Sequence, residues 1–232
     1  MSTLTWPPTK ATEFVTGFIN VPSALDRQNS PQVDPVRSRT LARMAHFVAV
    51  RLTGSDPAQG RGGPVCPFAS LGARSGGILL ADSIATLQDE PIIVEQVTHM
   101  HRMFRDWAAD CPGEPPLVGR ALVLTFSRLE GAHGAAMIER IQEMLKPLFV
   151  QDGLMLGQFY PGCPGGGIHN PQFRPLDAPV ISLAIRYMHL ADAPFMLGSE
   201  HFRHAFEDRY GAEGKAEIKR LLANKGARAN LA

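Results

Sequence analysis

The stretch ALVLTF at residues 121–126 is apolar at every position except Thr125. An apolar run of this kind is typical of a strand that is covered on both faces of a sheet. Short runs of apolar residues predict further strands over 77–81, 154–160 and 180–188. Helical patterns separate most of these strands. The chain is therefore predicted to have an α+β fold, in which a mixed, mostly antiparallel sheet is flanked by helices.

The helices are predicted from apolar spacing and from capping residues. The first begins at Asp34, a good N-cap residue followed by Pro35 at the first helical position, and it ends at Gly54. Its inner face is predicted to hold Leu41, Met44, Ala45, Val48 and Leu52. The other predicted helical segments are one that follows Asp89 and those over 132–148, 199–210 and 213–224.

The helix predicted over 132–148 has one clear apolar face. Its inward residues are predicted to be Met137, Ile138, Ile141, Met144 and Leu145. Pro147 would bend this helix or close it, because proline removes a backbone donor.

The chain is predicted to contain one domain preceded by an arm. Residues 1–34 are rich in Pro, Thr, Ser and Asn, and they are predicted to form an extended N-terminal arm. Residues 35–232 are predicted to form the single α+β domain. A domain of this size can bury a substantial core without disulfides or metals.

Net charge and composition argue against two classes of binding partner, nucleic acids and membranes. The chain has 23 Lys and Arg against 22 Asp and Glu, a net charge of +1, and it has no basic run. It also lacks an apolar run long enough to cross a bilayer. We therefore expect no nucleic-acid partner and no membrane partner, and a homodimer stays open. Three cysteines without framework spacing, and no secretory signal pattern, predict a reducing, cytoplasmic location.

The segment 161–178 is the richest in Gly and Pro and is predicted to be a long loop. Loops of this length without secondary structure are usually functional or disordered. Because it also carries apolar residues, it is interpreted as an ordered wall of an active site, and an irregular packed connection is the alternative. The glycine-rich run GCPGGG at 162–167 resembles a phosphate-binding loop, but it lacks the Lys-Ser/Thr end of that motif and no helix is predicted after it. Nucleotide binding is therefore not expected at this loop.

Cysteine and arginine supply further candidate site residues. Each cysteine precedes a proline, at Cys66, Cys111 and Cys163, and a thiolate in such a position can ligate haem iron. The alternative is that loops simply collect both residue types. Arg186 lies in the apolar strand pattern ISLAIRYM, so it is expected to pair or to face a cleft, and its partner is expected to be a carboxylate of the protein or of a ligand.

Three segments carry a resemblance to a known family. They are VCPFASLGAR (65–74), GLMLGQFYPGCPGGGIHNPQFRPLDAPVISLAIRYM (153–188) and DAPFML (192–197). They resemble a bacterial domain family that is common in actinobacteria and is distantly similar to the YqcI/YcgG-like proteins. Some of those proteins are haem-dependent oxygenases that hydroxylate guanidine or amine nitrogens of amino acids. The resemblance covers about residues 60–200.

The resemblance implies a haem-dependent oxygenase or oxidoreductase that acts on an amino-acid-like, nitrogen-containing small molecule. The family pattern has His-Pro where this sequence has Tyr160-Pro161, and His where Tyr187 stands. The expected iron ligand is therefore His169, with Tyr160 and Cys66 as alternatives. Residues expected to bind a haem propionate or a substrate carboxylate are Arg74, Arg174 and Arg186.

Two other functions fit the same residues. A non-catalytic module could hold haem or a metabolite in the same pocket without turnover. A cofactor-free enzyme could use Cys66 as its nucleophile, although no histidine in the sequence is an obvious base for it.

Overall fold

The computed structural model describes residues 4–26, 34–110 and 117–229. Its strands are β1 (Ile19–Asn20), β2 (Ile78–Ser83), β3 (Ala121–Phe126), β4 (Leu154–Phe159) and β5 (Ser182–Tyr187). In the described part of the chain they form one sheet in the order β1-β2-β3-β5-β4. Strands β2 and β3 are parallel, and the other three neighbouring pairs are antiparallel. The predicted α+β fold with a mixed, mostly antiparallel sheet is confirmed.

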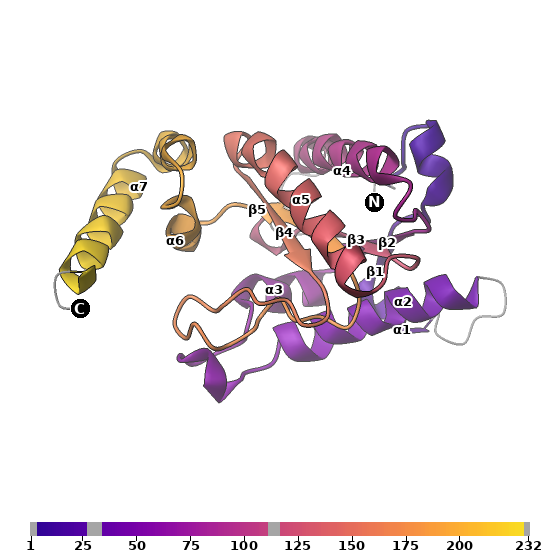
Figure 1. Cartoon of the computed structure of the whole chain (residues 1–232), viewed down its shortest axis with the longest axis horizontal. Helices are drawn as coiled ribbons and strands as arrows, with labels where there is room; N and C mark the ends of the chain where they lie inside the picture. Colours follow the sequence, from indigo (N-terminus) through magenta and orange to yellow (C-terminus); the bar gives the residue numbers. More distant parts are fainter. Residues whose placement is uncertain (1–3, 27–33, 111–116, 230–232) are drawn as a thin grey trace.

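Helices cover both faces of the sheet, as Figure 1 shows. Helices α4 (Glu90–Asp110) and α5 (Gly131–Gln151) pack on one face. The other face is covered by α2 (Pro35–His46), by the π-helical turn that continues it (Phe47–Leu52) and by α3 (Pro67–Ser75). Covering on both faces explains why the central strands are apolar throughout.

The predicted strand over 121–126 is confirmed as β3, in the middle of the sheet. Its side chains alternate between the two faces. Leu122 and Leu124 join the hydrophobic cluster beneath α4 and α5, whereas Val123 joins the cluster beneath α2 and α3. All three side chains are buried. The strand therefore holds the two halves of the core together.

Helix α2 begins where the sequence predicts. The Asp34 side chain accepts a hydrogen bond from the backbone N–H of Val36 at 2.8 Å. The five apolar residues predicted on the inner face are all buried. The helix widens into its π-helical turn before Gly54, whose N–H donates to the carbonyl oxygen of Val50 at 3.1 Å. The predicted start, inner face and end are thus confirmed.

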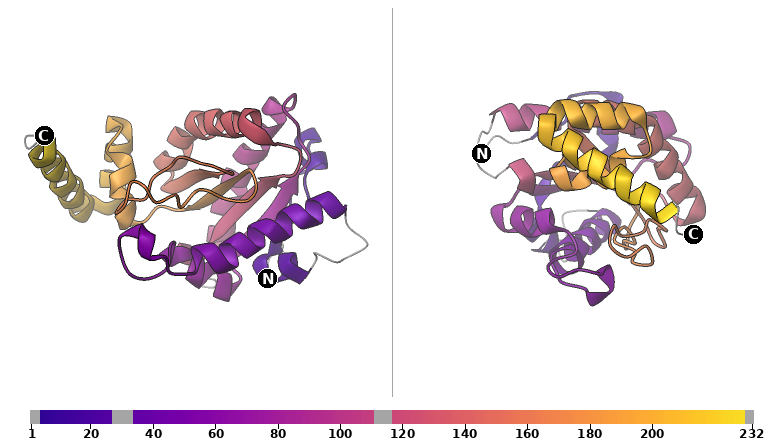
Figure 2. Two further views of the ribbon diagram at one scale, coloured as in Figure 1. Left: turned by 60° about the horizontal axis from the view of Figure 1, so that its bottom comes forward. Right: turned by 90° about the vertical axis from the view of Figure 1, so that its left-hand side faces the viewer.

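The C-terminal region lies at one end of the sheet. Helix α6 (Ala193–Met196) and helix α7 (Glu200–Ala229) share a small hydrophobic cluster centred on the fully buried Phe206. Gly211 interrupts α7 with a φ of 57° and a ψ of −131°, a conformation that favours glycine. The two predicted helical segments are thus confirmed, and Figure 2 shows the second one extending away from the sheet.

The predicted extended arm over 1–34 needs correction. Its described part contains a 3-10 turn (Lys10–Phe14), strand β1 and helix α1 (Val21–Asp26). β1 pairs with β2, and the Trp6 ring stacks on Phe18 with centroids 5.0 Å apart. This segment folds because its apolar side chains pack on the same cores as the domain. The described segment therefore packs on the domain and is not extended throughout.

The structure differs from the sequence analysis at two positions of α5, and it contains one helix that was not predicted. Met144 is 55% exposed rather than inward, because α5 is covered on one side only. Pro147 does not close α5, which continues to Gln151. Helix α3 was not predicted, since Ala69 and Gly72 are its only buried residues and give almost no apolar pattern. Among the described residues, none of the helices is both long and apolar enough to cross a membrane.

Candidate functional site

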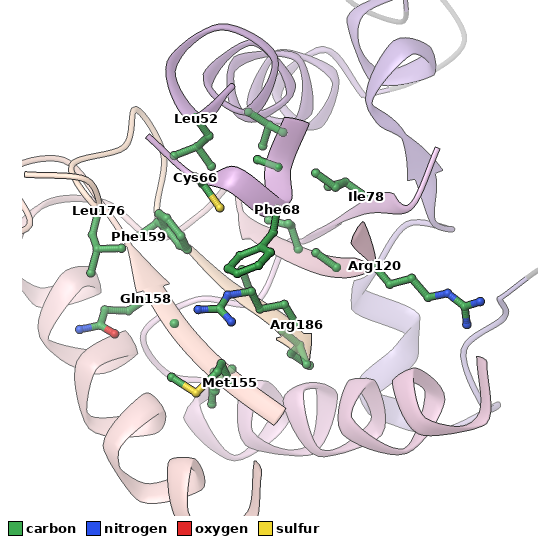
Figure 3. A pocket seen from close by; sticks show the side chains of 18 of the residues that line it. Leu52, Cys66, Phe68, Ile78, Arg120, Met155, Gln158, Phe159, Leu176 and Arg186 are labelled. Atoms are coloured by element: carbon green, nitrogen blue, oxygen red, sulfur yellow. The ribbon is translucent and has the colours of Figure 1, made fainter. Parts of the chain in front are cut away.

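A cavity of about 340 Å³ lies between the α2–α3 layer and the sheet, beside the edge strand β4. Its volume falls in the range of small-molecule sites, which are mainly apolar with a small number of convergent polar groups. Figure 3 shows side chains from both layers facing it. Apolar side chains that line it include Val48, Leu52, Phe68, Val123, Met155 and Phe159.

Six polar side chains also line this cavity, and among the described residues that line it none is acidic. They are Cys66, Arg120, Gln142, Lys146, Gln158 and Arg186. Gln142 is anchored by a hydrogen bond from its Nε2 to the carbonyl oxygen of Leu156 at 2.8 Å. The wall is therefore apolar with a positive bias.

Arg186 projects from β5 into this cavity beside Phe68 (Figure 3). Its guanidinium forms a two-pronged ion pair with Asp192, in which both N···O distances are 2.7 Å. It also lies 5.1 Å from the centroid of the Phe68 ring. Although burial opposes the charge, the Asp192 carboxylate raises the pKa of Arg186 above its ordinary value. Arg186 thus stays charged, and the requirement for a carboxylate partner is met by Asp192.

The two other basic residues on the wall have different surroundings. Arg120 is 1% exposed, donates to the carbonyl oxygen of Trp107 at 2.9 Å and lies over the Trp107 ring. Figure 3 shows its guanidinium pointing away from Arg186. Lys146 extends from α5, and its ammonium lies 5.1 Å from the Phe202 ring centroid. Burial lowers the pKa of Lys146, and nearby Glu143 partly offsets this effect.

Cys66 lies at the N-cap of α3, and its sulfur faces this cavity (Figure 3). Pro67 begins the helix, so the cysteine stays outside it. The backbone N–H of Cys66 donates to the carbonyl oxygen of Leu52 at 2.8 Å, which holds the main chain from which the thiol projects. Of the three residues predicted as iron ligands, only Cys66 lines this cavity.

The other two predicted iron ligands lie elsewhere. Tyr160 is buried on the α4–α5 side of the sheet, where its hydroxyl donates to Glu139. Burial, together with this hydrogen bond, raises the pKa of Tyr160, which disfavours a tyrosinate. His169 is exposed in the loop after β4. Cys163 is buried next to Tyr160 in the core, and Cys111 lies outside the described residues.

Two of the predicted arginines also lie outside this cavity. Arg74 is exposed near the C-terminal end of α3. Arg174 is half-buried and donates to the carbonyl oxygen of Pro171 within its own loop. The loop 161–178, interpreted from the sequence as an active-site wall, contributes only Leu176 to the cavity among the described residues. The structure therefore brings together Cys66 and Arg186 from the predicted set.

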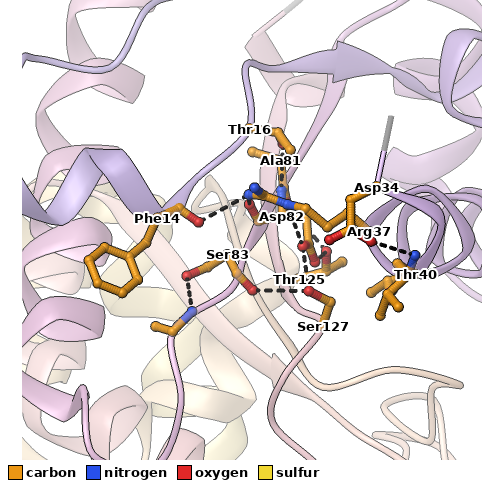
Figure 4. A network of polar contacts seen from close by, with 12 residues as sticks. Phe14, Thr16, Asp34, Arg37, Thr40, Ala81, Asp82, Ser83, Thr125 and Ser127 are labelled. Carbon is orange, nitrogen blue, oxygen red and sulfur yellow. Dashed lines mark hydrogen bonds and ion pairs between the residues drawn. The ribbon is translucent and has the colours of Figure 1, made fainter. Parts of the chain in front are cut away.

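A second polar cluster lies at the C-terminal end of β2 (Figure 4). The fully buried Asp82 carboxylate accepts hydrogen bonds from the hydroxyls of Thr125 and Ser127, both at 2.7 Å, and from Arg37 Nε at 3.2 Å. Arg37 also donates to the carbonyl oxygen of Phe14, so it ties the N-terminal segment to the sheet. Burial raises the pKa of Asp82 to about 6, although these donors oppose the rise.

The Asp82→Asn variant tests this cluster. The folded state holds a proton on Asp82 more tightly than the unfolded state, because its pKa is about 6 rather than 3.8. The free energy of unfolding of the wild type is therefore expected to fall as the pH rises from about 4 to above 6, because Asp82 must give up its proton in the folded state. Between about pH 7 and about pH 4, the wild type is expected to gain up to about 3 kcal/mol relative to the variant. Urea unfolding of both proteins at several pH values measures this change, and a wild type that loses stability relative to the variant toward acid would contradict the raised pKa.

A more polar hollow of about 530 Å³ lies between the end of α5 and α7. Its ionisable wall residues are Asp152, His201, His204, Asp208 and Arg209. Asp152 already forms a 2.8 Å salt bridge with Arg105. Within residues 4–26, 34–110 and 117–229, no group of three or more His, Cys, Asp or Glu side chains is arranged to hold a metal ion. The apolar cavity is therefore the stronger candidate site.

Several residues of this site were not predicted from the sequence. Lys146 and Gln142 occupy ordinary positions on α5, and Phe68 belongs to the helix that was missed. Asp192 lies six residues beyond Arg186, and an acidic residue so close to a strand arginine was a usable signal. Asp82 could also have been singled out from the sequence, because it is a carboxylate at the end of an apolar strand.

Comparison with known proteins identifies one domain family that this chain matches. Residues 41–221 match the family model described as a domain of unknown function (DUF6875). This match covers most of the chain and includes every described residue of the cavity wall. No curated protein and no solved structure matches the chain.

Proposed function

We propose that this chain, which belongs to the DUF6875 family, binds a small and mainly apolar molecule in the cavity between the α2–α3 layer and the sheet. The composition of the wall carries this proposal. Apolar side chains supply most of the surface, and Cys66, Gln158 and Arg186 add a small number of polar groups. That combination is characteristic of preformed small-molecule sites.

The Gly157→Leu variant tests this proposal. Gly157 lines the cavity, and a Cβ at this position would meet only the Phe159 ring, at 3.7 Å. A leucine there would fill space that the ligand needs while leaving the strand intact. Binding of N-phenyl-1-naphthylamine, a neutral apolar dye, is expected to weaken at least about tenfold, or about 1.4 kcal/mol. Fluorescence titration of the dye measures this change.

The Gly198→Leu variant is the matched control for this test. Gly198 is exposed outside the cavity, and a Cβ there would meet nothing within 4 Å. The control is expected to bind the dye as the wild type does. If the wild type does not bind the dye, or if Gly157→Leu binds it equally well, the proposed site is wrong.

Haem is the specific ligand that we propose for this site, with oxygenation of an amino-acid-like nitrogen compound as the reaction. The resemblance to YqcI/YcgG-like proteins suggests haem, and the Cys66 thiol on the cavity wall is the observation that favours it. When bound, haem would supply the redox chemistry with dioxygen. The chain would supply the Cys66 thiol for the iron, Arg186 for a propionate, and apolar walls that exclude water.

Cys66→Ser separates haem binding from other ligands. After expression with a haem precursor, the wild type is expected to show a Soret band whose position in the reduced carbonyl form indicates thiolate ligation. The variant is expected to lose that signature. Cys163→Ser serves as the control, because Cys163 is buried in the core outside the cavity. A wild-type spectrum without a Soret band would remove haem, and bound haem without oxygen consumption would support the non-catalytic module.

A further inference from the structure

We infer that the ligand of this cavity is a carboxylic acid with an apolar body, whose carboxylate binds the Nε–Nη2 side of Arg186. This inference rests on the proposed small-molecule function and adds the chemical class of the ligand. It does not require haem.

The hydrogen bonds of Arg186 leave one side of its guanidinium open. Nη1 donates to the carbonyl oxygen of Tyr187 at 2.9 Å and to Asp192 Oδ2 at 2.7 Å. Nη2 donates to Asp192 Oδ1 at 2.7 Å. A guanidinium has five N–H groups, so the Nε–H and one N–H of Nη2 have no acceptor among the described residues. These two groups point the same way and form the fork that binds a carboxylate through both oxygens.

Arg186 lines the cavity and keeps part of its side chain exposed. The Arg186 side chain is 26% exposed, whereas Asp192 on its paired side is 4% exposed. Phe68 lies over the guanidinium, and Figure 3 shows the guanidinium directed into the cavity beside this ring. A ligand can therefore approach in the plane of the guanidinium, which is the direction that two-pronged binding needs.

Asp192 holds Arg186 in this orientation before any ligand binds. The same carboxylate accepts a hydrogen bond from the backbone N–H of His189 at 2.8 Å. The arginine side chain is thus ordered in advance, and the ligand does not have to order it. This arrangement suits recognition of a fixed anionic group better than a mobile surface arginine would.

The charge of the wall favours an anion. Arg186 is neutralised by Asp192, but Lys146 forms no salt bridge with any described residue. Burial lowers the pKa of Lys146, and Glu143 offsets this only in part. A ligand carboxylate would compensate the lysine charge. The rest of the wall is apolar, so the remainder of the ligand is expected to be apolar as well.

Three probes test this inference, and they share an eight-carbon alkyl chain but differ in their polar group: octanoate, octan-1-ol and octylamine. Each is titrated against the dye-loaded, unmodified protein, and displacement of N-phenyl-1-naphthylamine is measured. Octanoate is expected to bind at least about tenfold more tightly than octan-1-ol, and octylamine is expected to bind most weakly. Equal affinities for octanoate and octan-1-ol would overturn the inference while leaving the proposed function intact. Failure of the dye and of all three probes would overturn both.

The Arg186→Lys variant locates the carboxylate. Lysine keeps the positive charge that pairs with Asp192 but lacks the fork. Octanoate affinity is expected to fall about tenfold, whereas octan-1-ol affinity should change less than about twofold. Arg220→Lys is the matched control, because Arg220 also pairs with a carboxylate, that of Glu217, but on the surface of α7. Undiminished octanoate affinity in Arg186→Lys would contradict the assignment.

A measurement on the unmodified protein covers the case in which Arg186→Lys does not fold. The NMR chemical shift of the Arg186 Nε–H proton is expected to change when octanoate is added and to stay unchanged when octan-1-ol is added. An unmoved Nε–H signal at saturating octanoate would overturn the inference.

Discussion

Gly72→Ala is expected to destabilise the protein by about 3 kcal/mol, one of the largest effects available from a single methyl group. A Cβ at position 72 would lie 2.2 Å from the carbonyl oxygen of Gly119 and 2.7 Å from Cγ1 of Ile78. The backbone oxygen cannot move aside as a flexible side chain could. Helix α3 would have to shift away from the 3-10 turn Leu117–Gly119, and this helix carries the Cys66 and Phe68 walls of the cavity.

Urea unfolding and dye titration measure the two consequences of Gly72→Ala. Its free energy of unfolding should fall, and dye affinity should fall with it because the cavity wall moves. Gly198→Ala is the control, since a Cβ there would meet nothing within 4 Å and alanine restricts the unfolded chain. The control is expected to stay within about 1 kcal/mol of the wild type. A Gly72→Ala variant as stable as this control would show that the close approach of α3 is unimportant.

Asp192→Ala is expected to cost about 2–3 kcal/mol of unfolding free energy. The substitution removes the carboxylate that pairs with Arg186 and leaves the backbone N–H of His189 without its acceptor. Asp192 is only 3% exposed, so water does not easily replace it. We expect a smaller loss of unfolding free energy than for a fully buried ion pair, because the Arg186 side chain is 26% exposed and keeps some contact with water.

A surface ion pair and a double variant control this result. Glu217→Ala breaks the pair with Arg220, whose side chain is 57% exposed, and should cost less than about 1 kcal/mol. Combining Asp192→Ala with Arg186→Met should recover part of the lost stability, because no unpaired charge then remains. Chemical unfolding of the wild type, Asp192→Ala, Arg186→Met and the double variant measures the coupling. Additive effects of the two substitutions would mean that the ion pair contributes little.

The candidate site was only partly visible in the sequence. Arg186 was identified because a charge in an apolar strand demands a partner, and Cys66 because of its Cys-Pro setting. His169 and Arg174 were chosen from the unusual loop 161–178, but the structure places them outside the cavity. Lys146 could not be identified, because a single lysine on a helix gives no local sign that the fold will place it on a cavity wall.

The sequence by itself determined the main elements of this protein. The run at 121–126 made a covered strand, Asp34 began a helix, and the C-terminal helical region divided between residues 210 and 213, because each depends on residues only a few positions apart. Tertiary structure alone decided the strand order β1-β2-β3-β5-β4 and the parallel pairing of β2 with β3. It also created the cavity, whose walls come from positions between 44 and 195. Such contacts arise from packing between distant segments, and local patterns of polarity do not encode them.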